Sequence, residues 1–297
     1  MNRITQATAV KAALKKLENE LPNYTINELR IVVALERVVA RLERHAELPR
    51  HLVFKGGFVL LKTINTSRFT RDIDALALDI SRENIVNMVQ QALKVDLHDG
   101  FWFGDVEVED LKNQGPYGGY RFSCAFQIGD PPKEKAKIKK LSRLHLDIGF
   151  GDALEEVPPK TMMPAMIAAD KPVSWSIYPL EYIFAEKLEA LISRGAGSSR
   201  AKDIYDMPLI FPSCDPKTLA EAIVSTFKIR QTAIPSSFHK TAQATDATSL
   251  SDSWGALDLP QESPIKFDRC WREFINCLAV VDHAMLGKAD LRPKRHR

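Results

Sequence analysis

Two glycines and two aspartates lie close together in the sequence and combine residue types that handle metals and phosphates. Gly56 and Gly57 open an apolar run that predicts a helix over 58–64, and Asp72 and Asp74 follow on a predicted strand. Side chains alternate along a strand, so the two carboxylates share one face. Glycines at a helix N-terminus leave backbone N–H groups open to an anion, and Mg²⁺ prefers carboxylate and phosphate oxygens. The stretch therefore predicts a site for a metal-bound nucleotide.

The segments around this stretch show the periodicity of elements that would hold such a site. Apolar residues recur at three- and four-residue intervals over 4–21 and 26–44, which predicts two amphipathic helices. Later patterns predict a helix from Ser81 to residue 93, antiparallel strands over 101–109 and 119–128 joined by the turn 114–119, and a strand over 143–150. Together they indicate helices around a sheet.

The second half of the sequence is mainly helical in pattern. An irregular stretch over 155–175 ends in a predicted strand over 174–178. Helices are then predicted over 180–193, 215–227 and 267–286, with a loose polar segment over 231–253. We therefore expect two domains, 1–175 and 176–297.

Composition and charge exclude several classes of protein. Of the 297 residues, 45% are hydrophobic and 27% charged, which is enough apolar material for two cores. The net charge of +3 does not by itself indicate a nucleic-acid binder, so any basic surface is local. The four cysteines form no Cys-x-x-Cys pair, and no apolar run approaches membrane-spanning length. We expect a cytoplasmic protein that does not contact a membrane.

A further carboxylate, Asp147, lies between Leu146 and Ile148 in an otherwise apolar predicted strand. Burial of an unpaired carboxylate is unfavourable, and either a metal or a cationic partner would remove that penalty. Asp152 is an alternative acidic residue, although it follows Gly151 in a predicted loop.

Two basic segments have two interpretations each. The lysine-rich stretch 133–140 fits contacts to RNA phosphates and equally fits the solvated tip of a hairpin. The basic tail 288–297 fits either a mobile end or a nucleic-acid contact.

The order and spacing of these residues resemble the polymerase-beta-like nucleotidyltransferase superfamily and, within it, the AbiEii/AbiGii-type toxins, which include the MenT toxins. The family pattern is Lys-Gly-Gly, an apolar helix, Arg-Phe-Ser/Thr and Asp-aliphatic-Asp. It stands here as Lys55-Gly56-Gly57, Arg68-Phe69-Thr70 and Asp72-Ile73-Asp74. Two later family blocks match Glu-Lys-Leu-x-Ala-Leu at 186–191 and Arg-x-Lys-Asp-aliphatic-Tyr-Asp at 200–206. Gly57 stands where the wider superfamily more often has serine.

The resemblance implies a fold and an activity. The fold is α+β, with a polymerase-beta-like mixed sheet flanked by helices and followed by a mainly helical C-terminal domain. The activity is that of a toxin of a type IV-like toxin–antitoxin pair, which transfers a nucleoside monophosphate from an NTP to the 3′ end of tRNA and so blocks translation. It further implies Mg²⁺, an NTP that is CTP or another pyrimidine, a tRNA acceptor, and a cognate antitoxin that is DNA-binding or kinase-like.

The resemblance also assigns roles to individual residues. Metal ligands are Asp72, Asp74 and, as the third acidic residue of the superfamily, Asp147. Catalytic residues are these three together with Lys187 and Asp203 from the C-terminal domain, where Lys187 is expected to hold the triphosphate. The nucleotide-binding residues are Lys55, Gly56, Gly57, Thr70, Arg200 and Lys202. Thr70 is in addition a candidate site of inactivating modification.

Two other functions fit the same residues. The sheet is shared by enzymes that modify proteins and small molecules, so nucleotidylation of either is an alternative. A non-catalytic RNA-binding module is a third possibility. The presence of Asp72, Asp74, Lys187 and Asp203 argues against it, because a binding module has no need of paired carboxylates that face an anionic ligand.

Overall fold

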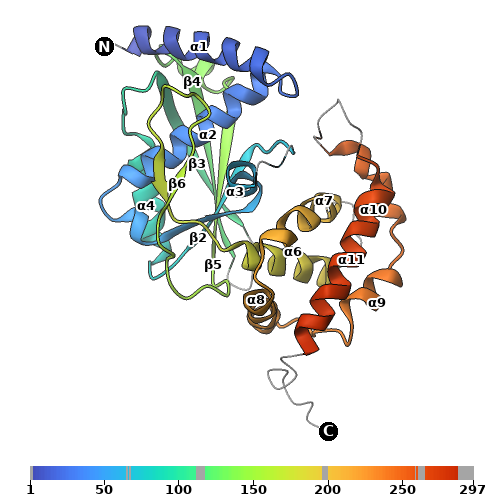
Figure 1. Ribbon diagram of the computed structural model, residues 1–297. Coiled ribbons are helices and arrows are strands. Elements are labelled where there is room, and N and C mark those ends of the chain that lie inside the picture. The colour runs from blue at the N-terminus through green and yellow to red at the C-terminus, as the bar shows by residue number, and fades with distance from the viewer. Residues whose placement is uncertain are drawn as a thin grey trace. The chain divides into compact units, whose positions relative to one another are not determined.

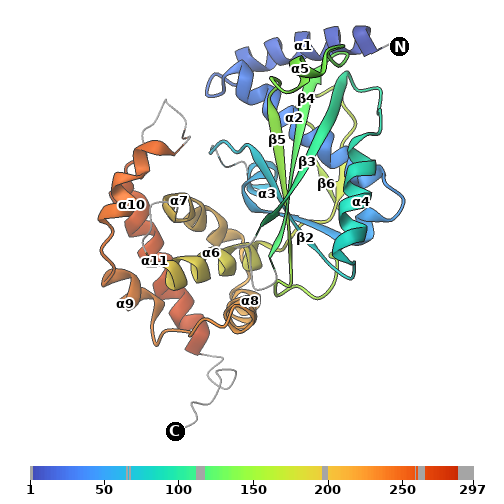
Figure 2. The same ribbon diagram turned by 180° about the vertical axis from the view of Figure 1, so that it is seen from behind.

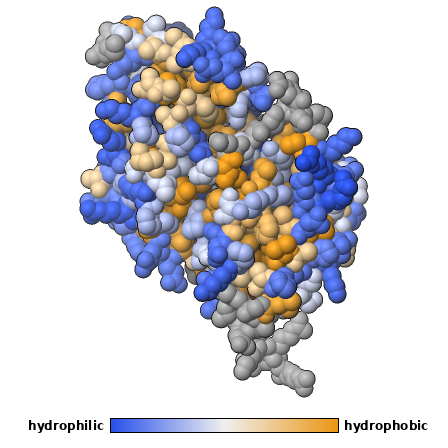
Figure 3. Space-filling view, in the orientation of Figure 1, coloured by the Kyte–Doolittle hydropathy of each residue, from blue (hydrophilic) through white to orange (hydrophobic). Residues whose placement is uncertain are grey.

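The computed structural model describes residues 3–64, 66, 68–111, 118–195, 200–257, 259 and 265–286. The chain forms two compact units (Figure 1). Unit 1 contains residues 1–65, 69–151 and 155–177, and unit 2 contains residues 66–68, 152–154 and 178–297. Figure 3 shows hydrophilic and hydrophobic residues mixed on the visible surface of both units. Among the described residues, no helix is long and apolar enough to span a membrane.

The described part of unit 1 is built on a five-stranded sheet in the order β1-β2-β5-β4-β3. Strands β2 and β5 are parallel, and every other neighbouring pair is antiparallel, as the mixed sheet of the prediction requires. The strands are β1 Leu52–Lys55, β2 Asp72–Ala77, β3 Phe101–Leu111, β4 Gly119–Ile128 and β5 Arg143–Phe150. The predicted α+β fold is confirmed.

Helices cover one face of this sheet because that face is apolar. Helix α2, Ile26–Arg44, and helix α4, Arg82–Leu93, contact the sheet there, and both views of the ribbon show them along it (Figures 1 and 2). Val38 of α2 and Leu93 of α4 meet a set of strand side chains made up of Ile73, Phe122, Cys124, Leu144 and Leu146. The opposite face carries the aspartates of β2 and β5.

Local sequence signals account for the ends of the helices in unit 1. Thr25 and Glu28 form a capping box at the start of α2, and Ser81 caps α4 by accepting from the Asn84 N–H. Helix α1, Arg3–Glu20, precedes α2, as predicted. Helix α3, Gly56–Thr63, begins at the first glycine and not at residue 58. A short helix α5, Lys135–Ile138, connects the antiparallel strands β4 and β5, so the lysine-rich stretch is a hairpin tip.

The stretch 155–177 is more regular than predicted. It contains β6, Thr161–Met163, paired antiparallel with β7, Val173–Trp175. Trp175 is buried and its ring lies 5.5 Å from that of Phe54 and 5.9 Å from that of Phe58. Three-residue strands are too short to show a periodicity, and this aromatic contact fixes β7 instead.

Unit 2 is helical in its described residues. Its helices are α6 Leu180–Arg194, α7 Ala201–Ile210, α8 Pro216–Ile229, α9 Phe238–Gln243, α10 Thr248–Asp252 and α11 Phe267–Leu286. Helix α6 ends at Gly195, which adopts the left-handed φ of 69°. Helix α11 contacts α7, α8 and α9. The predicted helices over 180–193, 215–227 and 267–286 are confirmed.

The prediction of a loose segment over 231–253 is wrong, because α9 and α10 lie within it. Asp282 of α11 accepts hydrogen bonds from the Ser237 hydroxyl and from the Phe238 and His239 N–H groups, which fixes the start of α9. A contact with a residue 45 positions away in the chain leaves no local pattern. The predicted turn at 114–119, except for its last two residues, and the basic tail lie outside the described residues.

Candidate active site

Strand pairing places the predicted carboxylates on one face of the sheet in unit 1. The parallel register sets Asp72 opposite His145 and Asp74 opposite Asp147. Directly paired residues on neighbouring strands point to the same side, so Asp72, Asp74 and Asp147 share a face. We call these three residues the acidic face. Asp147 thus lies on β5, the strand next to the Asp-x-Asp strand.

The first glycine of the pair lies directly against this face. Gly56 has a φ of 73°, and a Cβ atom at this position would lie 2.1 Å from Asp74 Oδ2. Both the backbone angle and the approach of the carboxylate therefore require glycine. The N-cap residue of α3, Lys55, pairs with Asp74 in the sheet, and no side chain at this N-cap accepts from the helix. The N-terminal N–H groups of α3 thus lie beside a carboxylate, an arrangement suited to a metal-bound anion.

Asp147 has a cationic partner that the sequence analysis did not identify. Arg121 on β4, its partner in the strand register, donates from Nε and Nη2 to the two carboxylate oxygens at 2.8 and 2.7 Å. The hydrogen bond to Asp147 raises the pKa of Arg121 above its ordinary value against the effect of burial, and the charges of Asp147, Asp72 and Asp74 act in the same direction. Arg121 thus keeps the buried Asp147 paired. The signal available in the sequence was the alternation of side chains along β4, which places Arg121 and every second residue after it on one face.

A second residue missed from the sequence is His145. Its Nδ1 lies 3.3 Å from Asp72 Oδ1, and the two side chains are 38% and 45% exposed. The Asp72 carboxylate is therefore accessible to solvent. The parallel register of β2 and β5 sets His145 opposite Asp72. The signal available in the sequence was a histidine two residues before Asp147, which faces the same side of the strand.

The acidic face is not a preformed metal cage. Within the described ranges, no group of three or more His, Cys, Asp or Glu side chains is arranged to hold a metal ion. Asp72 and Asp74 nevertheless fit Mg²⁺, which proteins often bind through one or two carboxylates while water and substrate phosphates supply the other ligands. The assignment of Asp147 as a third ligand stays a prediction.

In unit 2, Lys187 of α6 is bound to two aspartates of α7. Its Nζ lies 2.7 Å from Asp203 Oδ1 and 2.8 Å from Asp206 Oδ2. The carboxylates of Asp203 and Asp206 are only 2% and 0% exposed. Burial alone lowers the pKa of Lys187, but the two carboxylates outweigh it and raise the pKa above its ordinary value. Lys187 is therefore a charged ammonium in a buried ion pair.

Two arginines complete this group. Arg68 donates from Nε and Nη2 to the two oxygens of Asp206 at 3.1 and 3.0 Å, and Arg200 Nη1 lies 3.0 Å from Asp203 Oδ2. We call Lys187, Asp203, Asp206, Arg68 and Arg200 the Lys187 cluster. Its described members carry three positive and two negative charges. Arg68 of the Arg-Phe-Thr motif thus binds the last residue of the second family block.

Comparison with known proteins identifies the family. Residues 37–276 match the family described as nucleotidyl transferase AbiEii toxin, Type IV TA system. The chain belongs to the AbiEii family. The match covers both the Asp-x-Asp stretch and the Lys187 cluster, so the resemblance that the motifs indicated is confirmed. No curated protein matches the chain.

Two solved structures share the fold of this chain. JHP933 from Helicobacter pylori aligns with a TM-score of 0.52 at 16% identity, covering 90% of this chain and 96% of its own. A second H. pylori crystal structure, named as a candidate nucleotidyltransferase, aligns with a TM-score of 0.50 at 15% identity, covering 89% and 96%. At such low identity the likeness establishes the fold alone.

The remaining predicted residues of this AbiEii protein have different surroundings. Thr70 is half-buried and donates to the Asp72 carbonyl at 3.4 Å. Lys202 is exposed on α7 and forms no ion pair with a described residue. Asp152 belongs to unit 2 and lies 3.0 Å from Arg230 Nη2. It therefore does not take the place of Asp147 on β5.

Proposed function

We propose that this AbiEii protein transfers a nucleoside monophosphate from an NTP to the 3′ end of tRNA and thereby blocks translation. The observation that carries the proposal is the contact of Gly56 with the Asp74 carboxylate at the start of α3. It brings an acidic pair and a helix N-terminus together, which favours a metal-bound triphosphate over a free anion. By resemblance, the donor is CTP or another pyrimidine nucleotide.

Asp72 and Asp74 hold Mg²⁺ in this proposal, and the first N–H groups of α3 bind the phosphates. When bound, Mg²⁺ supplies positive charge to the triphosphate and to the attacking oxygen. The tRNA 3′-hydroxyl oxygen forms a bond to the α-phosphorus as the bond to the β-phosphate oxygen breaks. Pyrophosphate leaves, and the hydroxyl proton passes to solvent. The chain's own contribution is positioning and charge, as is general for phosphoryl transfer.

Lys187 has a defined capacity to bind a phosphate. An ammonium carries three N–H donors, and two of them go to Asp203 and Asp206. The third has no partner among the described residues, and the side chain is 12% exposed. By resemblance to the family, this donor is assigned to the triphosphate, and Asp203 fixes the direction of Lys187. Arg200 and Lys202 supply further positive charge.

The AbiEii family implies an antitoxin partner. By resemblance, a kinase-like antitoxin would modify Thr70, whose hydroxyl lies next to the Asp72 backbone. A phosphate there would add negative charge beside two carboxylates and oppose binding of the nucleotide. A DNA-binding antitoxin would instead act on expression, and would leave Thr70 unmodified.

The direct test is transfer of label. Purified protein is incubated with Mg²⁺, total tRNA and each α-labelled NTP in turn, with Asp72→Ala as the control. Label in tRNA for one nucleotide, absent with the variant, supports the proposal and identifies the donor. Label in a protein or small molecule instead would move the acceptor and refute the tRNA assignment. No label anywhere, with tRNA still bound, would favour the non-catalytic RNA-binding module.

A further inference from the structure

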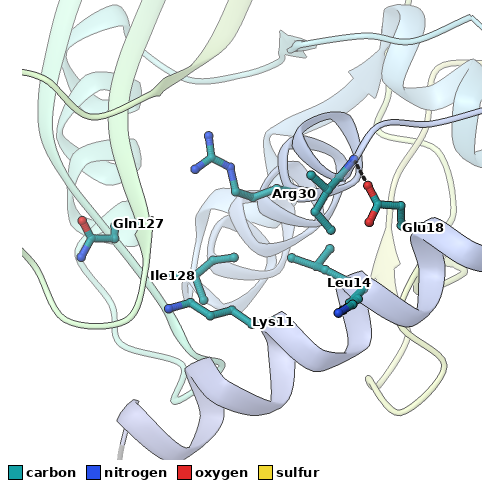
Figure 4. Close-up of a pocket in the computed structure, with 8 residues that line it drawn as sticks. Lys11, Leu14, Glu18, Arg30, Gln127 and Ile128 are labelled. Atoms are coloured by element: carbon teal, nitrogen blue, oxygen red, sulfur yellow. Dashed lines mark hydrogen bonds between the residues drawn. The ribbon is translucent and has the colours of Figure 1, made fainter.

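A cavity of about 530 Å³ in unit 1 lies away from the acidic face. It is formed by α1, α2 and the end of β4, and its lining combines apolar and basic side chains (Figure 4). The lining residues are Lys11, Leu14, Lys15, Glu18, Ile26, Arg30, Gln127 and Ile128. Its volume lies in the usual range for ligand pockets, about 300–1,000 Å³. None of the candidate active-site residues lines this cavity.

Arg30 is the cation best placed to bind a ligand in this cavity. One guanidinium nitrogen donates to Asn27 Oδ1 and to Ser142 Oγ at 2.9 Å each, and the guanidinium lies 5.3 Å from the centre of the Phe126 ring. Its Nε is buried and has no hydrogen-bond partner among the described residues. Partial burial lowers the pKa of Arg30 below its ordinary value, which an anion would reverse.

Two lysines add to this charge. Lys11 and Lys15 of α1 line the same cavity, and neither forms an ion pair with a described residue. The acidic lining residue, Glu18, already accepts from the Ile26 N–H at 3.2 Å, as the dashed line in Figure 4 shows. In that view Lys11 and Arg30 extend from their helices on the same side as Gln127 and Ile128. The cavity therefore presents three cationic side chains to an anion.

The charge continues beyond the cavity along one end of the sheet. Ser142, which Arg30 contacts, directly precedes β5 and follows the α5 hairpin tip. Exposed lysines of that tip include Lys133, Lys135, Lys139 and Lys140. Figure 2 draws α5 at the same end of unit 1 as α1. A run of cations of this length suits a polyanion better than a single small anion.

The distance from the acidic face points to the same kind of ligand. Gln127 and Arg121 lie on the same strand, six residues apart, which corresponds to about 20 Å along a strand. A nucleotide bound at the acidic face cannot span that distance, whereas an RNA acceptor can. Apolar lining residues such as Leu14 and Ile26 offer a surface for a ribose or base next to each phosphate.

We propose that the cavity between α1, α2 and β4 is a docking site for the phosphate backbone of the RNA acceptor. Arg30, Lys11 and Lys15 would bind one phosphate, and the lysines of the α5 tip would contact its neighbours. This inference rests on the proposed function only in its choice of RNA. Contacts of this type fix position without reading sequence.

The test compares two adjacent lysines of α1. Lys15 lines the cavity, whereas Lys16 does not and pairs with Glu20 at 3.5 Å. Binding of bulk tRNA to the full chain is measured across a salt series without NTP or Mg²⁺. Lys15→Ala is expected to weaken binding about 5-fold and to reduce the salt slope by about 1, and Lys11→Ala with Lys15→Ala to reduce the slope by about 2. Lys16→Ala is expected to leave both unchanged.

Thermal unfolding of each variant shows whether it is folded. Substitution of an exposed lysine is expected to change the free energy of unfolding little. An equal effect of Lys16→Ala would overturn the proposal, because net charge alone would explain it. Unchanged tRNA affinity in the double variant would also overturn it. If the same variant then bound polyglutamate more weakly, the cavity would be assigned to an acidic protein segment.

Failure of this proposal can be told apart from failure of the proposed function. Label transfer to tRNA by wild type, with the double variant binding tRNA as tightly, refutes the docking site and keeps the function. Tight, Lys15-dependent tRNA binding without any transfer of label refutes the function and keeps the docking site.

Discussion

The two sets of aspartates in this protein, on β2 in unit 1 and on α7 in unit 2, differ in what surrounds them. Asp72 of β2 is 45% exposed and lies beside a histidine. Asp203 and Asp206 of α7 are buried, and each is bound to Lys187 and to an arginine. A carboxylate can exchange water for a metal or a nucleotide only where it is open to solvent. Asp72 therefore suits chemistry, and the buried pair on α7 suits positioning.

This difference has energetic consequences. Removal of an exposed carboxylate leaves no buried charge behind, so the fold is expected to tolerate it. Removal of a buried one leaves cations unpaired in a medium that solvates them poorly. Substitutions of the two sets should therefore separate loss of activity from loss of stability.

The largest expected effect on stability is that of Asp206→Ala. It leaves Lys187 and Arg68 without their shared carboxylate and is expected to destabilise the protein by about 3–5 kcal/mol. Urea unfolding followed by circular dichroism measures the change. Asp215→Ala, which removes the N-cap of α8, is a control of smaller expected size, about 1 kcal/mol. Equal destabilisation by the two substitutions would contradict the large stabilising role assigned to Asp206 in the Lys187 cluster.

The opposite behaviour is expected of Asp72→Asn. It keeps the size of the side chain but removes a ligand charge, and is expected to lower the rate of label transfer about 100-fold, equivalent to about 2.7 kcal/mol. Its free energy of unfolding should change by less than about 0.5 kcal/mol. A large loss of stability with intact transfer would reverse the roles assigned to the two sets.

The sequence predicts more of unit 1 than of the Lys187 cluster. Periodicity and caps give the strands and the long helices, since each pattern is local, as in the capping box of Thr25 and Glu28. The family blocks point to Lys187 and Asp203. That Arg68 binds Asp206 is a contact between residues 138 positions apart, and no local pattern encodes it.

Strand register explains the other omissions. Arg121 and His145 become site neighbours only when β4 and β2 are each aligned against β5. A slip of one residue would turn Arg121 to the apolar face. The sequence shows that Asp147 needs a cationic partner or a metal, but which strand provides it depends on the tertiary pairing.

A third substitution tests the contact between the acidic pair and α3. Gly56→Ala places a methyl group 2.1 Å from Asp74 Oδ2 and at a φ of 73°, so a destabilisation of about 1–2 kcal/mol is expected from the backbone alone. Gly57→Ala lies within the first turn of α3 and is the matched control, with no positive φ. Thermal unfolding compares the two. Equal effects would show that Asp74 does not depend on the glycine at position 56.

The smallest expected effect is a pH dependence that Asp206 of the buried set contributes. Burial raises the pKa of Asp206, but Lys187 and Arg68 outweigh it and hold the pKa below its ordinary value. The unfolded chain then binds more protons than the folded protein in the window between that lowered pKa and the ordinary value of about 3.9. Stability from Asp206 is complete above about pH 3.9 and is lost as the pH falls through this window, by at most about 1.4 kcal/mol per pH unit.

Asp206→Asn removes this titration, so its free energy of unfolding should fall less steeply below pH 3.9 than that of wild type. Urea unfolding at a series of pH values measures both slopes. An unchanged slope for Asp206→Asn would mean that the ion pairs of Asp206 with Lys187 and Arg68 do not contribute to the pH dependence of stability.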